Sequence, residues 1–246
     1  MTVLNKHGAV PLYVQLKKLL ETQVETGVWL PHSRVPSERE LSEMYAISRM
    51  TARQALAELI QEGRLYTSAG KGTFVAEPKI RQSLQSLTSF TEDMRARGLK
   101  PTTRLLRRDM VPAPAIVAAS LRLAADTPVL CVERLRLADD EPMALETAYL
   151  AFPGVERLML SDLGGSLYNV LRDQFDLIPS EAQQEFEAIL PQPRVRTLLH
   201  LPEGAPVLQI QRITFDAQRQ PFEYVQSVYR GDRYRFVARL IREGAV

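Results

Sequence analysis

The sequence predicts a two-domain α+β protein, and three observations support this. The first 78 residues have the patterns of three short helices and a strand pair, whereas the rest is rich in long β patterns. A strand–turn–strand pattern occurs twice in that second part. At 246 residues, the chain has room for two domains of ordinary size. We therefore expect one domain over residues 1–77, a linker over 78–88 and a second domain over 89–246.

The composition excludes several classes of protein. Hydrophobic residues make up 45% and charged residues 24%, which excludes disorder throughout, collagen and a coiled coil. The net charge of +2 excludes a polybasic protein, so any surface for nucleic acid must be local. One cysteine and three histidines argue against a disulfide or a metal site, and no cofactor is expected. With no long apolar run and no signal-peptide pattern, we expect a cytoplasmic protein that does not contact the membrane. The single Cys131 is expected to be a buried strand residue.

Two helices are predicted before residue 46. The first covers Pro11–Thr26, where leucines and one valine recur at spacings of three and four. The second covers Ser37–Tyr45, because the residues Ser37–Glu40 form a capping-box pattern. Leu41 and Met44 are expected to face the core from this second helix.

A third helix and a β-hairpin complete the first domain. The helix begins at Ser48 and stops at Gly63, with an apolar stripe that ends at Ile60. Strands over 64–67 and 73–76 follow, joined by a Gly-rich turn. This order of elements is that of a winged helix-turn-helix domain.

The start of the third helix has the residues needed for reading DNA. Arg49 and Arg53 are four residues apart and therefore share one face. Arg, Thr and Gln in the first turns of such a helix suit the edges of bases in a major groove. The turn over 69–72 is small enough for a minor groove, with Lys71 near phosphates. A solvated helix face would carry the same arginines, but the ordered set of elements favours DNA.

The second domain contains an internal duplication. Leu123–Leu137 and Leu201–Phe215 align without gaps, 78 residues apart. Each is preceded by a short helical stretch and followed by a second strand. With flanking strands over 102–109 and 181–189, this predicts a mostly antiparallel sheet with helices packed on it.

Charged residues interrupt the apolar strands of this domain. Arg134 and Arg136 are two residues apart on one strand, so they point to the same face. Unpaired buried charge is costly, so this pair predicts a bound anion. The alternative is an internal ion pair between Arg134 and Glu146. It requires an odd number of loop residues between the two strands, such as Asp139–Glu141.

Further polar residues allow either a ligand-binding or a purely structural interpretation. Ser89 and Ser166 begin predicted helices, where free N–H groups and a hydroxyl can bind phosphate. Both serines could equally be plain N-caps. Glu223 and Tyr229 lie on one face of a late strand and could bind hydroxyl groups of a ligand, although Tyr229 could also be an edge-packing aromatic.

The first domain resembles the DNA-binding domain of the GntR family of bacterial transcription regulators. The resemblance covers residues 11–77 and rests on the patterns P-S-E-R-E-L and S-R-x-T-x-R-x-A-L and the Gly-rich wing. It implies a homodimeric repressor on a palindromic operator. Arg39 would contact the DNA backbone, Arg49 and Arg53 would read guanines, and Gly70 would enter the minor groove. The expected DNA-binding residues are Arg39, Ser48, Arg49, Met50, Thr51, Arg53, Gly70 and Lys71.

The second domain resembles the UTRA effector domain of the HutC branch of that family. The phrases SLTSFTEDMRARGLKP, ERLRLADDEPMALETAYL, GGSLYNVL and FEYVQSVYRGDRYRF carry the resemblance. They are most similar to repressors of N-acetylglucosamine use, of the NagR/DasR type. This implies a chorismate-lyase-like fold without catalysis and an amino-sugar phosphate effector, glucosamine 6-phosphate or N-acetylglucosamine 6-phosphate. The implied phosphate ligands are Ser89, Phe90, Thr91, Arg134 and Ser166, and the implied sugar ligands are Arg136, Glu146, Glu223 and Tyr229, with Tyr168 adjacent.

Two other functions remain open from the residues alone. Another anionic effector, such as a different sugar phosphate, a phosphonate or a urocanate-like acid, would suit the same architecture. An enzyme acting on a phosphosugar or a chorismate-like acid is less favoured, because no nucleophile–histidine or metal-ligand grouping is visible. Glu146 and Glu223 could still act as acid and base. We expect a regulator rather than an enzyme.

Overall fold

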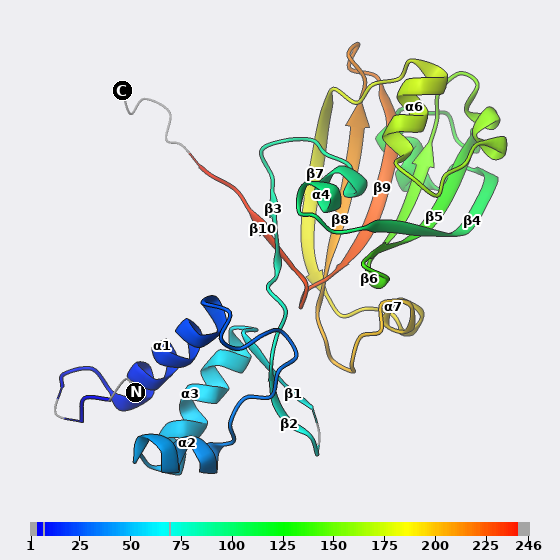
Figure 1. Ribbon diagram of the computed structural model, residues 1–246. Helices are drawn as coiled ribbons and strands as arrows, with labels where there is room; N and C mark the ends of the chain where they lie inside the picture. The colour runs from blue at the N-terminus through cyan, green and yellow to red at the C-terminus, as the bar shows by residue number, and fades with distance from the viewer. Residues whose placement is uncertain (1–3, 7, 69, 241–246) are drawn as a thin grey trace, which may run out of the picture. The chain divides into compact units, whose positions relative to one another are not determined.

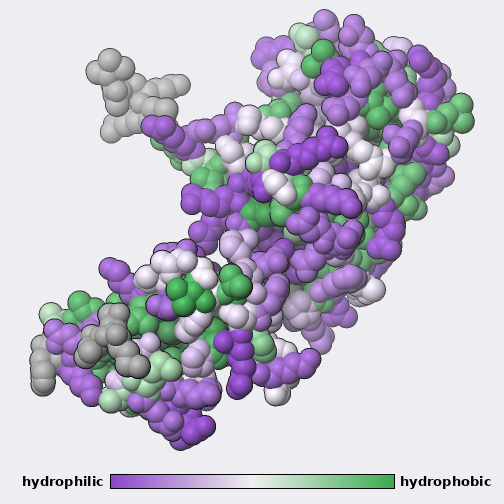
Figure 2. All heavy atoms as spheres, viewed as in Figure 1, coloured by the Kyte–Doolittle hydropathy of each residue, from purple (hydrophilic) through white to green (hydrophobic). Residues whose placement is uncertain are grey.

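The computed structural model describes residues 4–6, 8–68 and 70–240, and the chain divides into two compact units (Figure 1). The first unit runs up to Lys79 and the second starts at Ile80. The predicted α+β class is confirmed. On the face seen in Figure 2, hydrophilic residues cover most of the surface of each unit and apolar residues form only small patches.

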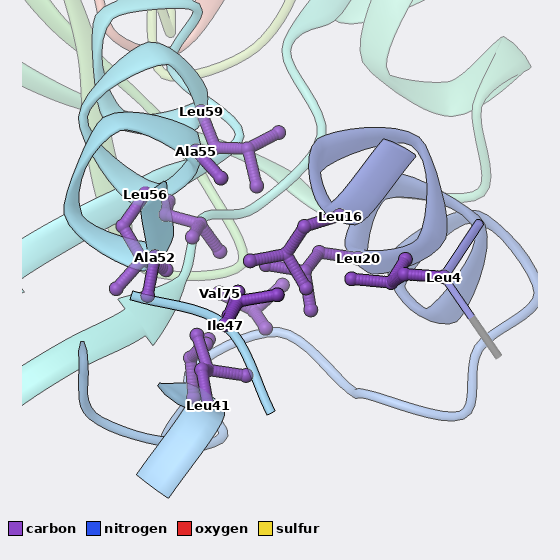
Figure 3. Close-up of a cluster of buried hydrophobic side chains, with 12 residues drawn as sticks. Leu4, Leu16, Leu20, Leu41, Ile47, Ala52, Ala55, Leu56, Leu59 and Val75 are labelled. Atoms are coloured by element: carbon purple, nitrogen blue, oxygen red, sulfur yellow. The ribbon is translucent and has the colours of Figure 1, made fainter. Parts of the chain in front are cut away.

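The first unit is a three-helix domain with a β-hairpin wing. Its elements are α1 (Leu12–Glu25), α2 (Glu38–Tyr45), α3 (Arg49–Gln61), β1 (Leu65–Ser68) and β2 (Gly72–Val75). Leucines of all three helices meet in one core, which Figure 3 shows in close-up. Ser37 caps α2 through a complete capping box, as the sequence predicts.

Two of the expected core residues are exposed instead. Met44 is 55% exposed, because Tyr45, four residues after Leu41, shares the buried face of α2 and packs against the core instead. Ile47 also enters the core. Ile60 is 36% exposed, at the border of the buried stripe of α3, which ends at Leu59.

We expect Leu16→Ala to destabilise the first unit by about 2–5 kcal/mol, because a fully buried leucine leaves a cavity when truncated. The single tryptophan, Trp29, packs against the same core, so its fluorescence reports unfolding of this unit. Met44→Ala is the matched control and should change the free energy of unfolding by less than about 0.5 kcal/mol. Equal losses from both variants would contradict this assignment of the core.

The second unit is built on a six-stranded antiparallel sheet in the order β4-β5-β6-β9-β8-β7. The strands are β4 (Pro101–Pro112), β5 (Pro128–Ala138), β6 (Glu141–Leu150), β7 (Glu181–Ile189), β8 (Val207–Phe215) and β9 (Pro221–Arg230). The helices are α4 (Phe90–Ala96), α5 (Ala115–Leu121), the 3-10 helix η1 (Val155–Leu160), α6 (Leu167–Phe175) and α7 (Pro193–Leu198).

The duplication extends further than the sequence predicts. Each half consists of a serine-capped helix, a long strand, a short helix and a hairpin: α4-β4-α5-β5-β6 in the first half and α6-β7-α7-β8-β9 in the second. The strand order is the same from either edge, with β6 and β9 paired at the centre. The two halves are therefore related by an approximate two-fold axis between β6 and β9.

A β-bulge sets the face on which Glu146 lies. The turn between β5 and β6 has two residues, Asp139 and Asp140, both with positive φ, so the expected odd loop is wrong. The register shifts by one residue after Arg136, and this extra residue has the same effect on the face of Glu146 as an odd number of loop residues. Arg134 and Glu146 therefore lie directly opposite each other, as the ion-pair alternative requires.

The expected linker, 78–88, contains a strand. β3 (Ile80–Ser83) pairs in parallel with β10 (Tyr234–Val237). Ile80 is buried in a cluster with Tyr234, so part of this polar segment is anchored to the second unit.

Candidate DNA-binding surface and anion-binding cavity

The exposed start of α3 presents most of the residues expected to read DNA. Arg49, Met50 and Arg53 are exposed there, on the side opposite the buried stripe. The Ser48 hydroxyl caps the helix by accepting a hydrogen bond from Thr51 N at 3.0 Å. The two hydroxyls also lie 2.8 Å apart, so Ser48 and Thr51 fix the helix start that carries the arginines.

Carboxylates hold two of the arginines on this surface. Arg53 Nε lies 3.2 Å from Glu38 Oε1, and Arg39 Nη1 lies 3.1 Å from Glu43 Oε1. Exposed pairs of this kind are worth at most about 1 kcal/mol. They can therefore be exchanged for contacts to a phosphate or a base.

The wing lies beside an arginine that the sequence analysis did not single out. Gly70 and Gly72 have φ of 71° and 115°, and Lys71 is exposed between them. A Cβ at Gly72 would lie 3.2 Å from Arg34 Nε, so the missing side chain leaves room for Arg34. Ala69, at the expected wing tip, lies outside the described residues.

A second group of polar side chains lies on one face of the sheet of the second unit. Arg134 and Arg136 on β5, Glu146 on β6, and Glu223 and Tyr229 on β9 line one cavity beneath α4 and α6. An apolar cluster lies on either side of this polar band. The cavity is narrow, with a volume of about 60 Å³.

Both serine-capped helices start at this cavity. Ser89 forms a capping box with Glu92, and the Ser166 hydroxyl accepts a hydrogen bond from Asn169 N at 3.4 Å. The two serine hydroxyls lie 3.4 Å apart. The serines are thus N-caps, and the two helix starts converge on the cavity.

Arg134 is paired with a carboxylate, as expected from the alternative of an internal ion pair with Glu146. Its Nε donates to Glu146 Oε1 at 3.0 Å, and its Nη2 donates to the same oxygen. Its Nη1 is buried without a hydrogen-bond partner among the described residues. Burial opposes the charged form of Glu146, but Arg134 and Arg136 hold its pKa below the usual value.

Arg136 is buried among uncharged partners. Its Nη2 donates to Thr91 Oγ1 at 2.9 Å and its Nη1 to Gly165 O at 3.4 Å, while its guanidinium carbon lies 4.8 Å from the centre of the Phe90 ring. Its Nε is buried without a partner among the described residues. Burial, followed by the charge of Arg134, lowers the pKa of Arg136 to about 10. An anion at this guanidinium would relieve the cost of burying it.

A hydroxyl network holds Glu223. Its Oε2 accepts hydrogen bonds from Tyr168 Oη at 2.9 Å and from Thr214 Oγ1 at 2.8 Å. Burial raises the pKa of Glu223 above its usual value, against the hydrogen bonds and the charge of Arg212 that lower it, and burial raises the pKa of Tyr229 to about 12. A carboxyl group and a phenol can both exchange hydrogen bonds with sugar hydroxyls.

Nine of the ten expected effector residues line the cavity, and Thr91 lies behind it as a partner of Arg136. Arg212 also lines the cavity, although the sequence analysis did not single it out. The signal was present, because Arg212 stands 78 residues after Arg134 and so occupies the equivalent position in the repeat.

Three further findings concern Cys131, metal-binding groups and membrane-spanning helices. Cys131 is buried, as expected. Among the described residues, no group of three or more His, Cys, Asp or Glu side chains could hold a metal ion. No described helix is both long and apolar enough to cross a membrane.

Two family models match the chain. The model described as bacterial regulatory proteins, gntR family, matches residues 12–75, and the UTRA domain model matches residues 96–235. The HTH-type transcriptional repressor NagR of Bacillus subtilis is 42% identical, over 95% of this chain and 96% of that protein. The HTH-type transcriptional regulator GgaR of Escherichia coli is 31% identical, over 92% of this chain and 90% of that protein. The crystal structure of PhnF from Mycobacterium smegmatis has a TM-score of 0.65 and 31% identity, and the match covers 94% of this chain and 99% of that chain.

Proposed function

The chain belongs to the GntR family of bacterial transcription regulators, in the branch that carries a UTRA domain, and we propose that an amino-sugar phosphate controls its binding to operator DNA. It is a transcriptional repressor by family, not an enzyme. The observation that supports the effector class best is Arg136, a buried guanidinium with uncharged partners at the point where two helix starts meet.

DNA recognition is proposed for the surface formed by α3 and the wing. Arg49 and Arg53 would read base edges in a major groove, while Arg39 and Lys71 would contact phosphates. A homodimer on a palindromic operator would place two such helices in grooves about 34–36 Å apart, or a multiple of that spacing. Part of the affinity would come from phosphate contacts, so it should fall with salt.

Effector recognition is proposed for the cavity of the second unit. Arg134 and the capping hydroxyls suit a phosphate, and Glu146, Glu223, Tyr168 and Tyr229 suit the hydroxyl and amino groups of a sugar. The family resemblance assigns Arg136 to the sugar, but its buried guanidinium beside Arg134 suits the phosphate as well, and we propose that it binds there. Glucosamine 6-phosphate or N-acetylglucosamine 6-phosphate has both kinds of group. The name of the NagR relative is in keeping with this class.

Binding would require the cavity to widen. A volume of about 60 Å³ holds a few water molecules, whereas pockets for small ligands measure about 300–1,000 Å³. Strand pairing holds the sheet in place, so the cavity would widen by displacement of α4 or α6, and we propose α4. Arg97 ties α4 to β3, because its Nη2 donates to Arg81 O at 2.7 Å and its Nη1 donates to Asp93 O. A displaced α4 would thus pull on the strand that follows the DNA-binding unit along the chain.

A thermal-shift and DNA-binding experiment tests the proposal. We expect glucosamine 6-phosphate or N-acetylglucosamine 6-phosphate to stabilise the protein by about 2.7 kcal/mol at 100 times its Kd. The same compound should change the affinity for an operator selected from random DNA, measured by fluorescence anisotropy. Unphosphorylated N-acetylglucosamine is the control and should do neither. If only urocanate or a phosphonate gives a response, the proposed effector class is wrong. If the protein prefers no DNA sequence, the proposed recognition of operator DNA is wrong.

A further inference from the structure

We propose that Arg212 is a second binding point of the effector cavity and selects sugar phosphates whose amino group is acylated. This inference rests on the proposed function, because it assumes that the cavity holds an amino-sugar phosphate. It concerns a residue outside the set that the family resemblance implies.

The repeat places Arg212 opposite the phosphate-binding residues. Arg134 lies on β5 and Arg212 on β8, at equivalent positions of the two halves. In the order β5-β6-β9-β8, the two strands are three spacings apart, about 14 Å. Both side chains nevertheless line the same cavity, so a guanidinium reaches into it from each side.

The partners of the two arginines differ in charge. Arg134 is bonded to the carboxylate of Glu146, whereas Arg212 Nε donates to the neutral amide of Gln184 at 3.2 Å. The salt bridges between described residues include none to Arg212. Glu223, on the neighbouring strand β9, attracts Arg212 through its charge, and its Oε2 already accepts hydrogen bonds from two hydroxyls. Because no described carboxylate is bonded directly to Arg212, its guanidinium can still donate to a ligand oxygen and disfavours a ligand cation beside it.

The chemistry of the ligand brings its amino substituent to this side. The phosphate is carried on C6, which is attached to C5, and C2 lies across the pyranose ring from C5. When the phosphate lies against Arg134 and Arg136, the substituent on C2 points toward β8. The carbonyl oxygen of an acylamino group can accept hydrogen bonds from a guanidinium, whereas a free ammonium group is repelled by it.

The surroundings of Arg212 also suit an acyl group. Ile210 and Phe236 line the cavity beside it and offer apolar contact to a methyl group. Arg212 and Phe236 also line an adjoining groove of about 200 Å³, together with Gln184. The acyl group thus has a hydrogen-bond donor, an apolar wall and space beyond it.

Calorimetric titration of the full chain at pH 7 tests the assignment, with N-acetylglucosamine 6-phosphate and glucosamine 6-phosphate as ligands. We expect the wild type to bind the acetylated compound more tightly. Arg212→Met should weaken that binding at least tenfold and leave binding of the free amine unchanged or tighter. Arg219→Met is the matched control and should change neither affinity, because the Arg219 side chain is 80% exposed at the turn after β8.

The outcomes separate this inference from the function on which it rests. An unchanged affinity ratio in Arg212→Met, or a wild-type preference for the free amine, overturns the role of Arg212 but leaves the effector class standing. If the wild type binds neither compound, the proposed effector class fails and this assignment fails with it. If circular dichroism shows that Arg212→Met is unfolded, Arg212→Lys decides. Lys keeps the charge but loses the planar fork, so the preference for the acetylated compound should shrink.

Discussion

Arg136→Met should strongly weaken the response to sugar phosphate while leaving the protein at least as stable as the wild type. The hydrogen-bond partners of Arg136 are uncharged, so its removal leaves no buried charge without a partner. Methionine also fills much of the same volume. Each lost hydrogen bond to a charged group is worth about 1.5–3 kcal/mol, so affinity for the ligand should fall about 10- to 150-fold. Calorimetry measures the affinity, and denaturant unfolding measures the stability.

Arg134→Met is the informative contrast to this variant. It removes the partner of Glu146 and leaves a buried carboxylate unpaired, which costs about 3–5 kcal/mol. Adding Glu146→Gln to this variant should recover much of that loss. If Arg136→Met instead destabilised the protein as strongly as Arg134→Met, or kept wild-type affinity for the ligand, Arg136 would be a structural residue.

Arg49→Ala should strongly weaken sequence-specific DNA binding and leave the fold unchanged. One bidentate contact to guanine is worth about 1–3 kcal/mol of discrimination, so the preference for operator over random DNA should fall about 5- to 150-fold. Arg49 is exposed and, among the described residues, belongs to no salt bridge, so the free energy of unfolding should change by less than about 0.5 kcal/mol. Footprinting and anisotropy at fixed salt provide the comparison.

Lys71→Ala separates base reading from phosphate contact on the same surface. It should weaken binding to operator and random DNA alike and reduce the salt dependence by about one phosphate contact. A wild-type footprint from Arg49→Ala would refute the assignment of α3 as the reading helix.

Much of the fold could be predicted from the sequence because its signals are local. Capping boxes begin α2 and α4, and the repeat predicts the paired hairpins. What failed depends on tertiary context. Tyr45 rather than Met44 packs against the core, and the bulge after Arg136 replaces the expected odd loop. Neither feature leaves a periodic pattern in the sequence.

The candidate cavity could be predicted less completely, for a related reason. Its strand residues alternate on one face, and that alternation is visible in the sequence. Whether a charged residue on that face has a partner depends on contacts across strands and from helices. The pairing of Arg134 with Glu146 stayed open until the register was known. The role of Arg212 is visible in the sequence only through the repeat, in which Arg212 occupies the position equivalent to Arg134.

Differences between the two related halves of the sheet also make the two ends of the cavity chemically distinct. A duplicated fold starts with two equal halves, which would accept a ligand in either of two opposite orientations. Here the copies have diverged: the counterpart of Arg136 is Thr214, and the counterpart of Glu223 is Ala144. One half has the second cation, Arg136, and the other has a carboxyl group, Glu223. An unsymmetrical molecule therefore has only one favourable orientation across the axis. In that orientation its anionic end lies at the half with the second arginine, and its hydroxyl groups lie at the half with the carboxyl group.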